Sequence, residues 1–294
     1  MQVTPFGSDG APALEELART VDWQVGLGVG SLSALGMAGE FYKLATEEIE
    51  AVISCVVEAA TGCQTVVGVS AASAEVAARL ARHAARAGAD ALLVLPPFAI
   101  KPSAEGLIGY YETIARAADL PIMVQDGSDE IRAIVPLDTL IRLCQAVPAI
   151  RYIKVEDVAP GPKITALGEA LGDRVALLCG SGGLGVLDSY DRGAIGCISG
   201  AATADLLVSL DGVYRTGSRN AADERYRDLL PLIQFQCQST ELFIASEKRI
   251  LVRRGLISEA RVRLPGYTLD AREVSLLDAL CEQAGIALER EEVR

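Results

Sequence analysis

The sequence is poor in histidine and in aromatic residues. Its 294 residues include one histidine, His83, and aromatic side chains make up 5% of the chain. A single imidazole excludes sites that need several histidines, such as the His-Glu-x-x-His zinc motif. His83 lies in an alanine-rich segment among three arginines, which predicts a solvated helix face and not a catalytic position.

Positive charge is also scarce. The chain has 27 basic and 39 acidic residues, a formal net charge of -12. Phosphate groups would be repelled, so nucleic acid and anionic membrane are excluded as main partners. No apolar run reaches the ~20 residues of a membrane span. The first residues lack the basic and apolar regions of a signal peptide. We expect a cytoplasmic protein.

Cysteine pairs of the Cys-x-x-Cys type are absent, although the chain has seven cysteines. Most of the cysteines have apolar neighbours, which predicts buried, reduced thiols. The acidic residues Asp126, Asp129 and Glu130 are expected on a mobile loop facing solvent, not a metal ion. No nucleotide or flavin motif stands out. The sequence therefore predicts neither a metal nor a cofactor.

What the sequence does contain is an alternation of short apolar segments and alanine-rich helical segments. Eight segments are candidate strands: residues 3–5, which is the weakest, 29–35, 65–69, 91–95, 121–125, 152–155, 175–179 and 196–199. Helices are expected over residues 14–25, 46–60, 73–87, 104–118, 137–146 and 162–171. Continuously apolar strands are typical of parallel sheets covered on both faces. The count predicts an α/β fold, a (β/α)8 TIM barrel.

After residue 204 the strand pattern stops. Helices are expected over residues 205–216, 221–237, 239–254 and 271–284. We therefore predict a barrel over 1–204 and a C-terminal helical extension over 205–294. The alternative is a doubly wound open sheet. The glycine-rich segment 26–30 precedes a strand and lacks the Gly-x-Gly-x-x-Gly spacing of that fold, so it supports the alternative only weakly.

Chemistry in such a barrel gathers where the strands end, and there one strand carries a lysine, Lys154. A lysine in an apolar strand is costly to bury charged, and burial favours the neutral amine that attacks ketones. An ordinary lysine that reaches solvent or pairs with Glu156 or Asp157 is an equally good interpretation.

Four motifs together resemble one superfamily. They are Gly-Met-Ala-Gly-Glu at 36–40, Leu-Pro-Pro-Phe at 95–98 with Lys-Pro at 101–102, Ile-Lys at 153–154, and Gly-Ala-Ile-Gly-Cys-Ile-Ser at 193–199. Their order and spacing resemble the dihydrodipicolinate synthase / N-acetylneuraminate lyase superfamily over almost the whole chain. The resemblance implies a (β/α)8 barrel, a homotetramer or homodimer, and a Schiff base between a 2-oxo acid and Lys154.

The chain departs from the superfamily pattern at several positions. Met37 and Ala38 stand where hydroxyl residues usually hold the substrate carboxylate. Gln125 matches the usual proton-relay tyrosine, Ala99 lies near the second tyrosine, and Glu130 stands where the synthases carry an arginine. These losses argue against dihydrodipicolinate synthase itself. Segments 121–126 and 152–156 are similar to L-2-keto-3-deoxyarabonate dehydratases and their relatives.

We predict that Lys154 forms an imine with the C2 ketone of a 2-oxo acid, followed by dehydration or C3–C4 cleavage. Gln125 would orient the substrate, and Glu156 is expected to point away from the pocket unless the strand end bends. Amides near Met37, Ala38 and Gly39 would take the carboxylate. The other predicted lining residues are Phe98, Ser181, Ile198 and Ser199. The alternatives are a scaffold that binds a metabolite without turnover, and an aldolase for a bulkier, less polar substrate.

Overall fold

The computed structural model describes residues 1–127, 134–157 and 159–287. Within these ranges, strands and helices alternate along the first two thirds of the chain. The strands are β1 (Ser31–Ala34), β2 (Gln64–Gly68), β3 (Ala91–Val94), β4 (Ile122–Asp126), β5 (Ile150–Val155), β6 (Ala176–Cys179) and β7 (Gly196–Cys197). The helices around them are α1 (Leu14–Gly26), α2 (Thr46–Ala59), α3 (Ala74–Ala87), α4 (Ala104–Ala117), α5 (Leu137–Ala146), α6 (Pro160–Leu171), α7 (Val186–Asp191) and α8 (Ala204–Arg215).

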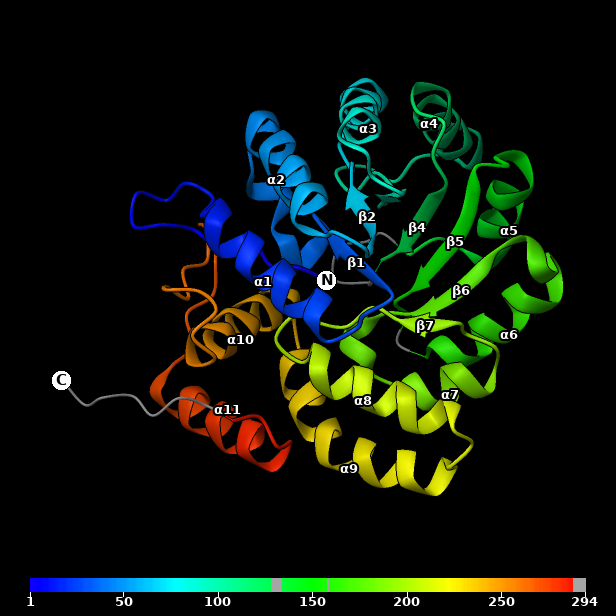
Figure 1. Ribbon diagram of the computed structural model, residues 1–294. Coiled ribbons are helices and arrows are strands. Elements are labelled where there is room, and N and C mark those ends of the chain that lie inside the picture. The colour runs from blue at the N-terminus through cyan, green and yellow to red at the C-terminus, as the bar shows by residue number, and fades with distance from the viewer. Residues whose placement is uncertain (128–133, 158, 288–294) are drawn as a thin grey trace.

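The strands form one parallel sheet in chain order, β1 to β7. The sheet curls round on itself, and the helices lie outside it (Figure 1). This is a (β/α)8-type barrel, as the alternation predicted. The six-residue helix α7 was not predicted, because it is too short to show a helical period.

The expected strand over residues 3–5 is wrong. The sheet of the described residues has seven strands, and the first residues instead run as a buried extended segment. The Met1 nitrogen donates to the Ser199 carbonyl at 2.7 Å, and the Gln2 amide donates to the Ser33 carbonyl at 2.7 Å. Pro5 has no amide hydrogen and cannot extend this pairing into a ladder. The segment therefore occupies the seam between β7 and β1 without becoming a regular strand.

Side chains alternate between two apolar layers along each strand. In β3, Leu92 and Val94 pack under the outer helices, whereas Ala91 and Leu93 point into a small interior cluster with Met123 of β4. This explains why the strands read as continuously apolar: both of their faces are buried. The interior cluster fills the barrel beneath the carboxyl ends of the strands.

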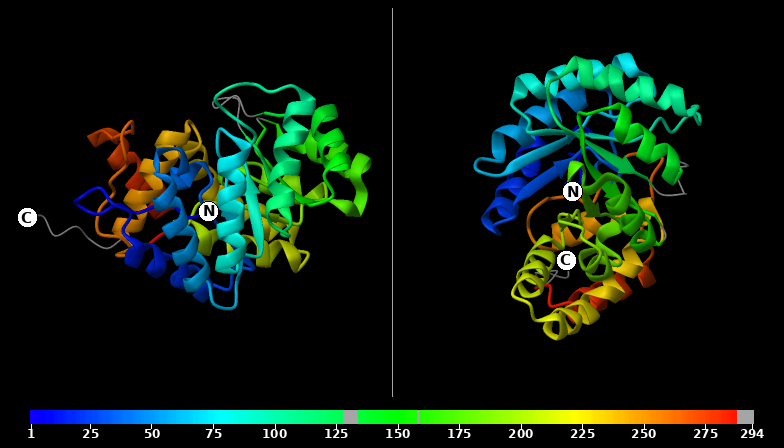
Figure 2. Two further views of the ribbon diagram at one scale, coloured as in Figure 1. Left: turned by 90° about the horizontal axis from the view of Figure 1, so that it is seen from above. Right: turned by 90° about the vertical axis from the view of Figure 1, so that its right-hand side faces the viewer.

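Three helices follow the barrel: α9 (Arg219–Gln236), α10 (Thr240–Arg253) and α11 (Ala271–Gln283). They gather on one side of the molecule with α8 (Figures 1 and 2). Their apolar side chains share one core with Cys179 of β6 and Val186 of α7. The division of the chain at residue 204 stays a prediction.

The single histidine and the seven cysteines lie at separate places in the fold. His83 sits on α3 and contacts the Ser54 hydroxyl of α2, 3.0 Å from Nε2. All seven cysteines lie in the described part of the chain and are free. No helix among the described residues is both long and apolar enough to cross a membrane.

A fully buried ion pair ties α10 to the loop after β1. The Lys248 ammonium contacts the Glu40 carboxylate, donates to the Arg261 carbonyl at 2.7 Å and lies 4.3 Å from the centre of the Phe6 ring. Burial lowers the pKa of Lys248 from 10.5 to about 8. The positive charges of Lys43 and Arg263 also lower this pKa, whereas the Glu40 carboxylate raises it. Removing one partner of a buried pair leaves an uncompensated charge, so this contact holds α10 against the barrel.

The lowered pKa of Lys248 predicts a rise in stability at high pH. Below pH 8 the folded and unfolded chains both hold this proton, so the full burial penalty applies. Between pH 8 and 10.5 the unfolded chain keeps a proton that the folded chain has lost, so the free energy of unfolding rises with pH. Relative to Lys248→Met, wild type should gain up to about 3 kcal/mol between pH 7.5 and 10.5.

Urea unfolding at constant protein concentration, followed by circular dichroism, measures this difference. Cysteines and tyrosines titrate in both proteins and cancel in the comparison. Lys101→Met changes an exposed lysine and should run parallel to wild type at every pH. A wild-type minus Lys248→Met difference that stays flat or falls with pH would contradict the prediction.

Candidate active site

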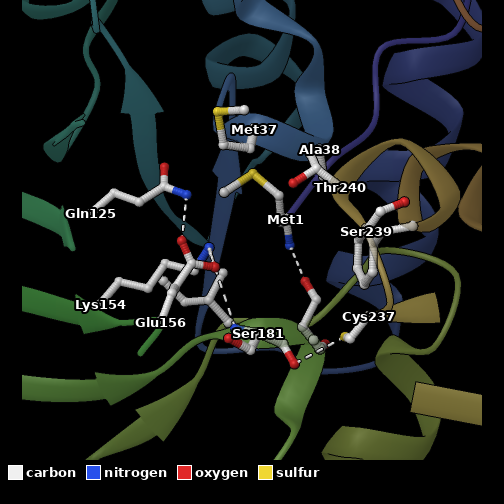
Figure 3. Close-up of a pocket in the computed structure, with 14 residues that line it drawn as sticks. Met1, Met37, Ala38, Gln125, Lys154, Glu156, Ser181, Cys237, Ser239 and Thr240 are labelled. Atoms are coloured by element: carbon white, nitrogen blue, oxygen red, sulfur yellow. Dashed lines mark hydrogen bonds and ion pairs between the residues drawn. The ribbon is translucent and has the colours of Figure 1, made fainter. Parts of the chain in front are cut away.

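A pocket lies at the carboxyl ends of the barrel strands. Five strand ends or the loops after them contribute to it, and the start of α10 forms its remaining wall. The residues that line it are Met1, Met37, Ala38, Gln125, Lys154, Glu156, Ser181, Gly182, Ile198, Ser199, Cys237, Ser239, Thr240 and Phe243 (Figure 3). The structure thus brings together most of the residues that the sequence analysis singled out.

Lys154 points into this pocket from β5. Its neighbours Ile153 and Val155 pack outward under the helices, and Tyr152 points inward with Lys154. Lys154 is 4% exposed, and its Nζ lies 2.8 Å from Oε1 of Glu156. The structure therefore contains the ion pair between Lys154 and Glu156 that was the alternative interpretation of this lysine. The pair lies inside a pocket, where it stays available to a ligand.

The expectation that Glu156 points away from the pocket is wrong. Side chains alternate along a strand, so residues two apart share a face, and Glu156 follows Lys154 inward. Its amide continues the pairing of β5 by donating to the Asp126 carbonyl at 3.2 Å. Gly180 makes room for it, because a methyl group there would lie 2.3 Å from Cγ of Glu156. Among the described residues that line the pocket, Glu156 is the one with a carboxylate side chain.

Gln125 holds Glu156 from the neighbouring strand. Its Nε2 donates to Oε2 of Glu156 at 2.6 Å, and the Ser181 amide donates to Oε1 at 3.3 Å (Figure 3). Gln125 is 1% exposed, and its Oε1 has no hydrogen-bond partner. A buried acceptor without a donor is costly, so Gln125 bears this cost while its amide group holds Glu156.

The loop after β1 brings Met37 and Ala38 to the pocket. Met37 and Ala38 begin the short 3-10 helix η1 (Met37–Gly39), and the first amides of a helix have no acceptor within it. Such amides bind carboxylates. Gly39 is buried behind them, and its carbonyl accepts from the Thr4 hydroxyl at 2.7 Å. Gly39 thus supports the loop and does not line the pocket.

Three residues near the pocket that are not glycine have a left-handed backbone conformation. Leu35 has φ 58°, Glu40 has φ 54° and Ser181 has φ 47°. Each such residue costs free energy, and the cost is usually found where function requires a fixed geometry. All three flank loops that line the pocket or support it.

The remaining predicted lining residues divide into two groups. Ser181, Ile198 and Ser199 line the pocket, from the loops after β6 and β7. Phe98 does not line it. Its ring packs edge-on against Phe41, with the ring centres 5.7 Å apart.

Several lining residues escaped the sequence analysis. Cys237, Ser239, Thr240 and Phe243 come from the junction of α9 and α10, more than 80 residues after Lys154. Ser239 caps α10 by accepting from the Leu242 amide at 3.1 Å. That cap marked a helix start, but nothing in the local sequence indicated that this helix end meets the barrel.

Asp126 also differs from its prediction. It is the last residue of β4, it is fully buried, and its carboxylate lies 2.6 Å from Nζ of Lys163 on α6. Burial raises the pKa of Asp126, and Lys163 opposes that rise. Asp129 and Glu130 lie outside the described residues. Within the described ranges, no group of three or more His, Cys, Asp or Glu side chains is arranged to hold a metal ion.

The fold and the pocket define a parallel barrel with a buried lysine–carboxylate pair at the carboxyl ends of its strands. The model of the dihydrodipicolinate synthetase family matches residues 1–284. The chain therefore belongs to that family.

Individual relatives match over nearly their full lengths. The chain is 32% identical over 291 residues to a 4-hydroxy-tetrahydrodipicolinate synthase of Cereibacter sphaeroides, covering 97% of each chain. It is 29% identical to the enzyme of that name from Bartonella bacilliformis, covering 98% of this chain and 97% of the relative. The crystal structure of dihydrodipicolinate synthase from Rhodopseudomonas palustris superposes with a TM-score of 0.87 at 29% identity, covering 96% of this chain and 95% of the other.

Proposed function

We propose that the protein is a Schiff-base lyase that acts on a 2-oxo acid through Lys154. The observation that carries this proposal is the Lys154–Glu156 pair, held at 2.8 Å inside a pocket at the strand ends. Attack on a ketone requires the free amine, and Glu156 is placed to take the proton that Lys154 must lose. Membership of the family supports the same chemistry.

The reaction begins when Nζ of Lys154 adds to C2 of the 2-oxo acid. Glu156 returns the lysine proton to the C2 oxygen, which departs as water and leaves a protonated imine that draws electrons away from C3. Glu156 removes a proton from C3, and the electron pair of that C–H bond forms an enamine. The amides of Met37 and Ala38 hold the C1 carboxylate. Gln125 holds Glu156 in position by donating to its carboxylate and orients the substrate beside it.

The two outcomes diverge at the protonated imine. In a dehydratase the enamine formed by loss of the C3 proton expels the C4 hydroxyl, which takes that proton back from Glu156 and leaves as water. In an aldolase Glu156 instead takes the proton of the C4 hydroxyl, and the C3–C4 bond breaks to give a carbonyl product and the enamine of Lys154. Similarity to L-2-keto-3-deoxyarabonate dehydratases favours the first. That choice, the cytoplasmic location and assembly as a homotetramer or homodimer remain predictions.

Reductive trapping tests the proposal. The protein is incubated with pyruvate, the simplest 2-oxo acid with protons on C3, and is then reduced with borohydride. Peptide mass analysis should find the reduced adduct on Lys154. A protein that binds 2-oxo acids without turnover would be thermally stabilised by pyruvate but would remain unlabelled. An unmodified Lys154, under conditions that label a control aldolase, would contradict the proposal.

A further inference from the structure

The pocket has two chemically different ends. Lys154, Glu156 and Gln125 lie on the strand side. The loop after β1, with Met37 and Ala38, packs against α10. The opposite wall comes from the α9–α10 junction, where Cys237 and Phe243 present apolar surface and Ser239 presents a hydroxyl. In the proposed complex, in which the 2-oxo acid is bound covalently to Lys154 with its C1 carboxylate at the loop after β1, the distal carbons would extend toward Cys237 and Phe243.

Phe243 is held firmly in this wall. A methyl group built on Gly182 would lie 3.0 Å from Cε2 of Phe243 and 3.0 Å from Sγ of Cys237. Cys237 in turn donates to the Ser181 carbonyl at 3.3 Å. Phe243 also packs on the interior cluster of the barrel, as Ile198 does. The wall is therefore a preformed surface that rests directly on the loop after β6.

The charges of the pocket are unsuited to a second anion. Among the described lining residues, Lys154 and Glu156 are the charged side chains. Met1 also lines the pocket, and burial together with Lys154 lowers the pKa of its α-amine to about 5, so that this amine is neutral near pH 7. Lys154 is committed to the covalent bond with C2, and Glu156 is negative in the form that accepts protons. A carboxylate at the distal end of the substrate would lose its water of hydration beside Phe243 and Cys237. It would find no cation there and would be repelled by Glu156.

We infer that the distal end of the substrate is uncharged and that Phe243 is the residue that selects for it. This inference rests on the proposed function of Lys154. The substrate class is a 2-oxo acid whose chain beyond C4 has an apolar face and no second carboxylate. The Ser239 hydroxyl already accepts the Leu242 amide, and its own proton remains able to donate to a neutral oxygen on that chain.

Two 2-oxo acids of equal chain length test the inference. In 2-oxohexanoate the sixth carbon is a methyl group, and in 2-oxoadipate it is a carboxylate. The measurement is the concentration of each acid that gives half-maximal borohydride trapping on Lys154, with pyruvate as reference. For wild type, 2-oxoadipate should require a concentration about tenfold higher or more.

Variants of Phe243 assign the effect to this residue. Phe243→Lys places a cation at the wall and should reduce the difference between the two acids to less than about threefold, or reverse it. Phe243→Leu keeps the wall apolar and should keep the preference, which guards against a folding defect in the lysine variant. Phe98→Leu changes an aromatic residue outside the pocket and should behave like wild type.

The outcomes separate the two proposals. If pyruvate labels Lys154 but wild type half-saturates with 2-oxoadipate at an equal or lower concentration than with 2-oxohexanoate, the inference is overturned and the proposed function stands. If Phe243→Leu loses the preference as completely as Phe243→Lys, Phe243 does not select by charge and its assignment is overturned. If no 2-oxo acid labels Lys154, the proposed function fails and the inference falls with it.

Discussion

Lys154→Arg should abolish the exchange of pyruvate methyl protons for deuterium. This exchange requires an imine and then an enamine, so it reports on Schiff-base turnover without knowledge of the natural substrate. Arginine keeps the positive charge beside Glu156, and its guanidinium does not become a free amine at accessible pH. We expect the exchange rate to fall by at least about 10³-fold, while the thermal midpoint stays close to that of wild type.

Proton NMR in D2O follows this exchange directly through the loss of the methyl signal. Lys101→Arg makes the same substitution at an exposed lysine, and its exchange rate should equal that of wild type. Exchange that survives in Lys154→Arg within tenfold of wild type would remove Lys154 from the mechanism.

Glu156→Gln should separate imine formation from proton transfer. The amide has nearly the shape of the carboxylate and stays within reach of Gln125, but it cannot accept a proton near neutral pH. We expect deuterium exchange to fall about 10²- to 10⁴-fold, the usual contribution of a general base. Borohydride trapping of pyruvate on Lys154 should still reach completion at mildly alkaline pH, where bulk water can take the lysine proton.

Two further variants sharpen this result. Glu156→Asp keeps the carboxylate but draws it back by one methylene, so it should recover part of the lost exchange. Glu105→Gln removes an exposed carboxylate that pairs with Arg142 and should leave exchange unchanged. If Glu156→Gln lost trapping and exchange in equal measure, Glu156 would serve to activate or position Lys154 and not to move the C3 proton.

The barrel and its lysine were predictable because their signals are local. The spacing of apolar residues along the sequence distinguishes the strands from the alanine-rich helices, and the one lysine within a strand is visible in the same reading. The seam between β7 and β1 was not predictable in the same way. Residues 3–5 are as buried as a strand, but their pairing depends on neighbours at both ends of the sheet and on the missing amide hydrogen of Pro5.

The residues of the site also divide into those that the local sequence predicts and those that it does not. Gln125 and Lys154 follow from their places at strand ends, and Ser181 follows from the glycine-rich turn after β6. The direction of Glu156 was also within reach, because the alternation of side chains along β5 settles it. The contribution of Phe243 was out of reach. It depends on how α10 packs over the barrel, through contacts such as that of Lys248 with Glu40, 208 residues apart in the chain.

The long separation between these partners has a consequence for how the protein is made. On the ribosome, β1 through β7 emerge before α10, so the barrel interior around Leu93 and Met123 lacks its contact with Phe243 until α10 has been synthesised. Nascent chains at that stage expose apolar surface of the kind that chaperones bind. The binding pocket is therefore completed late in synthesis, and ligand binding reports that the C-terminal helices have docked.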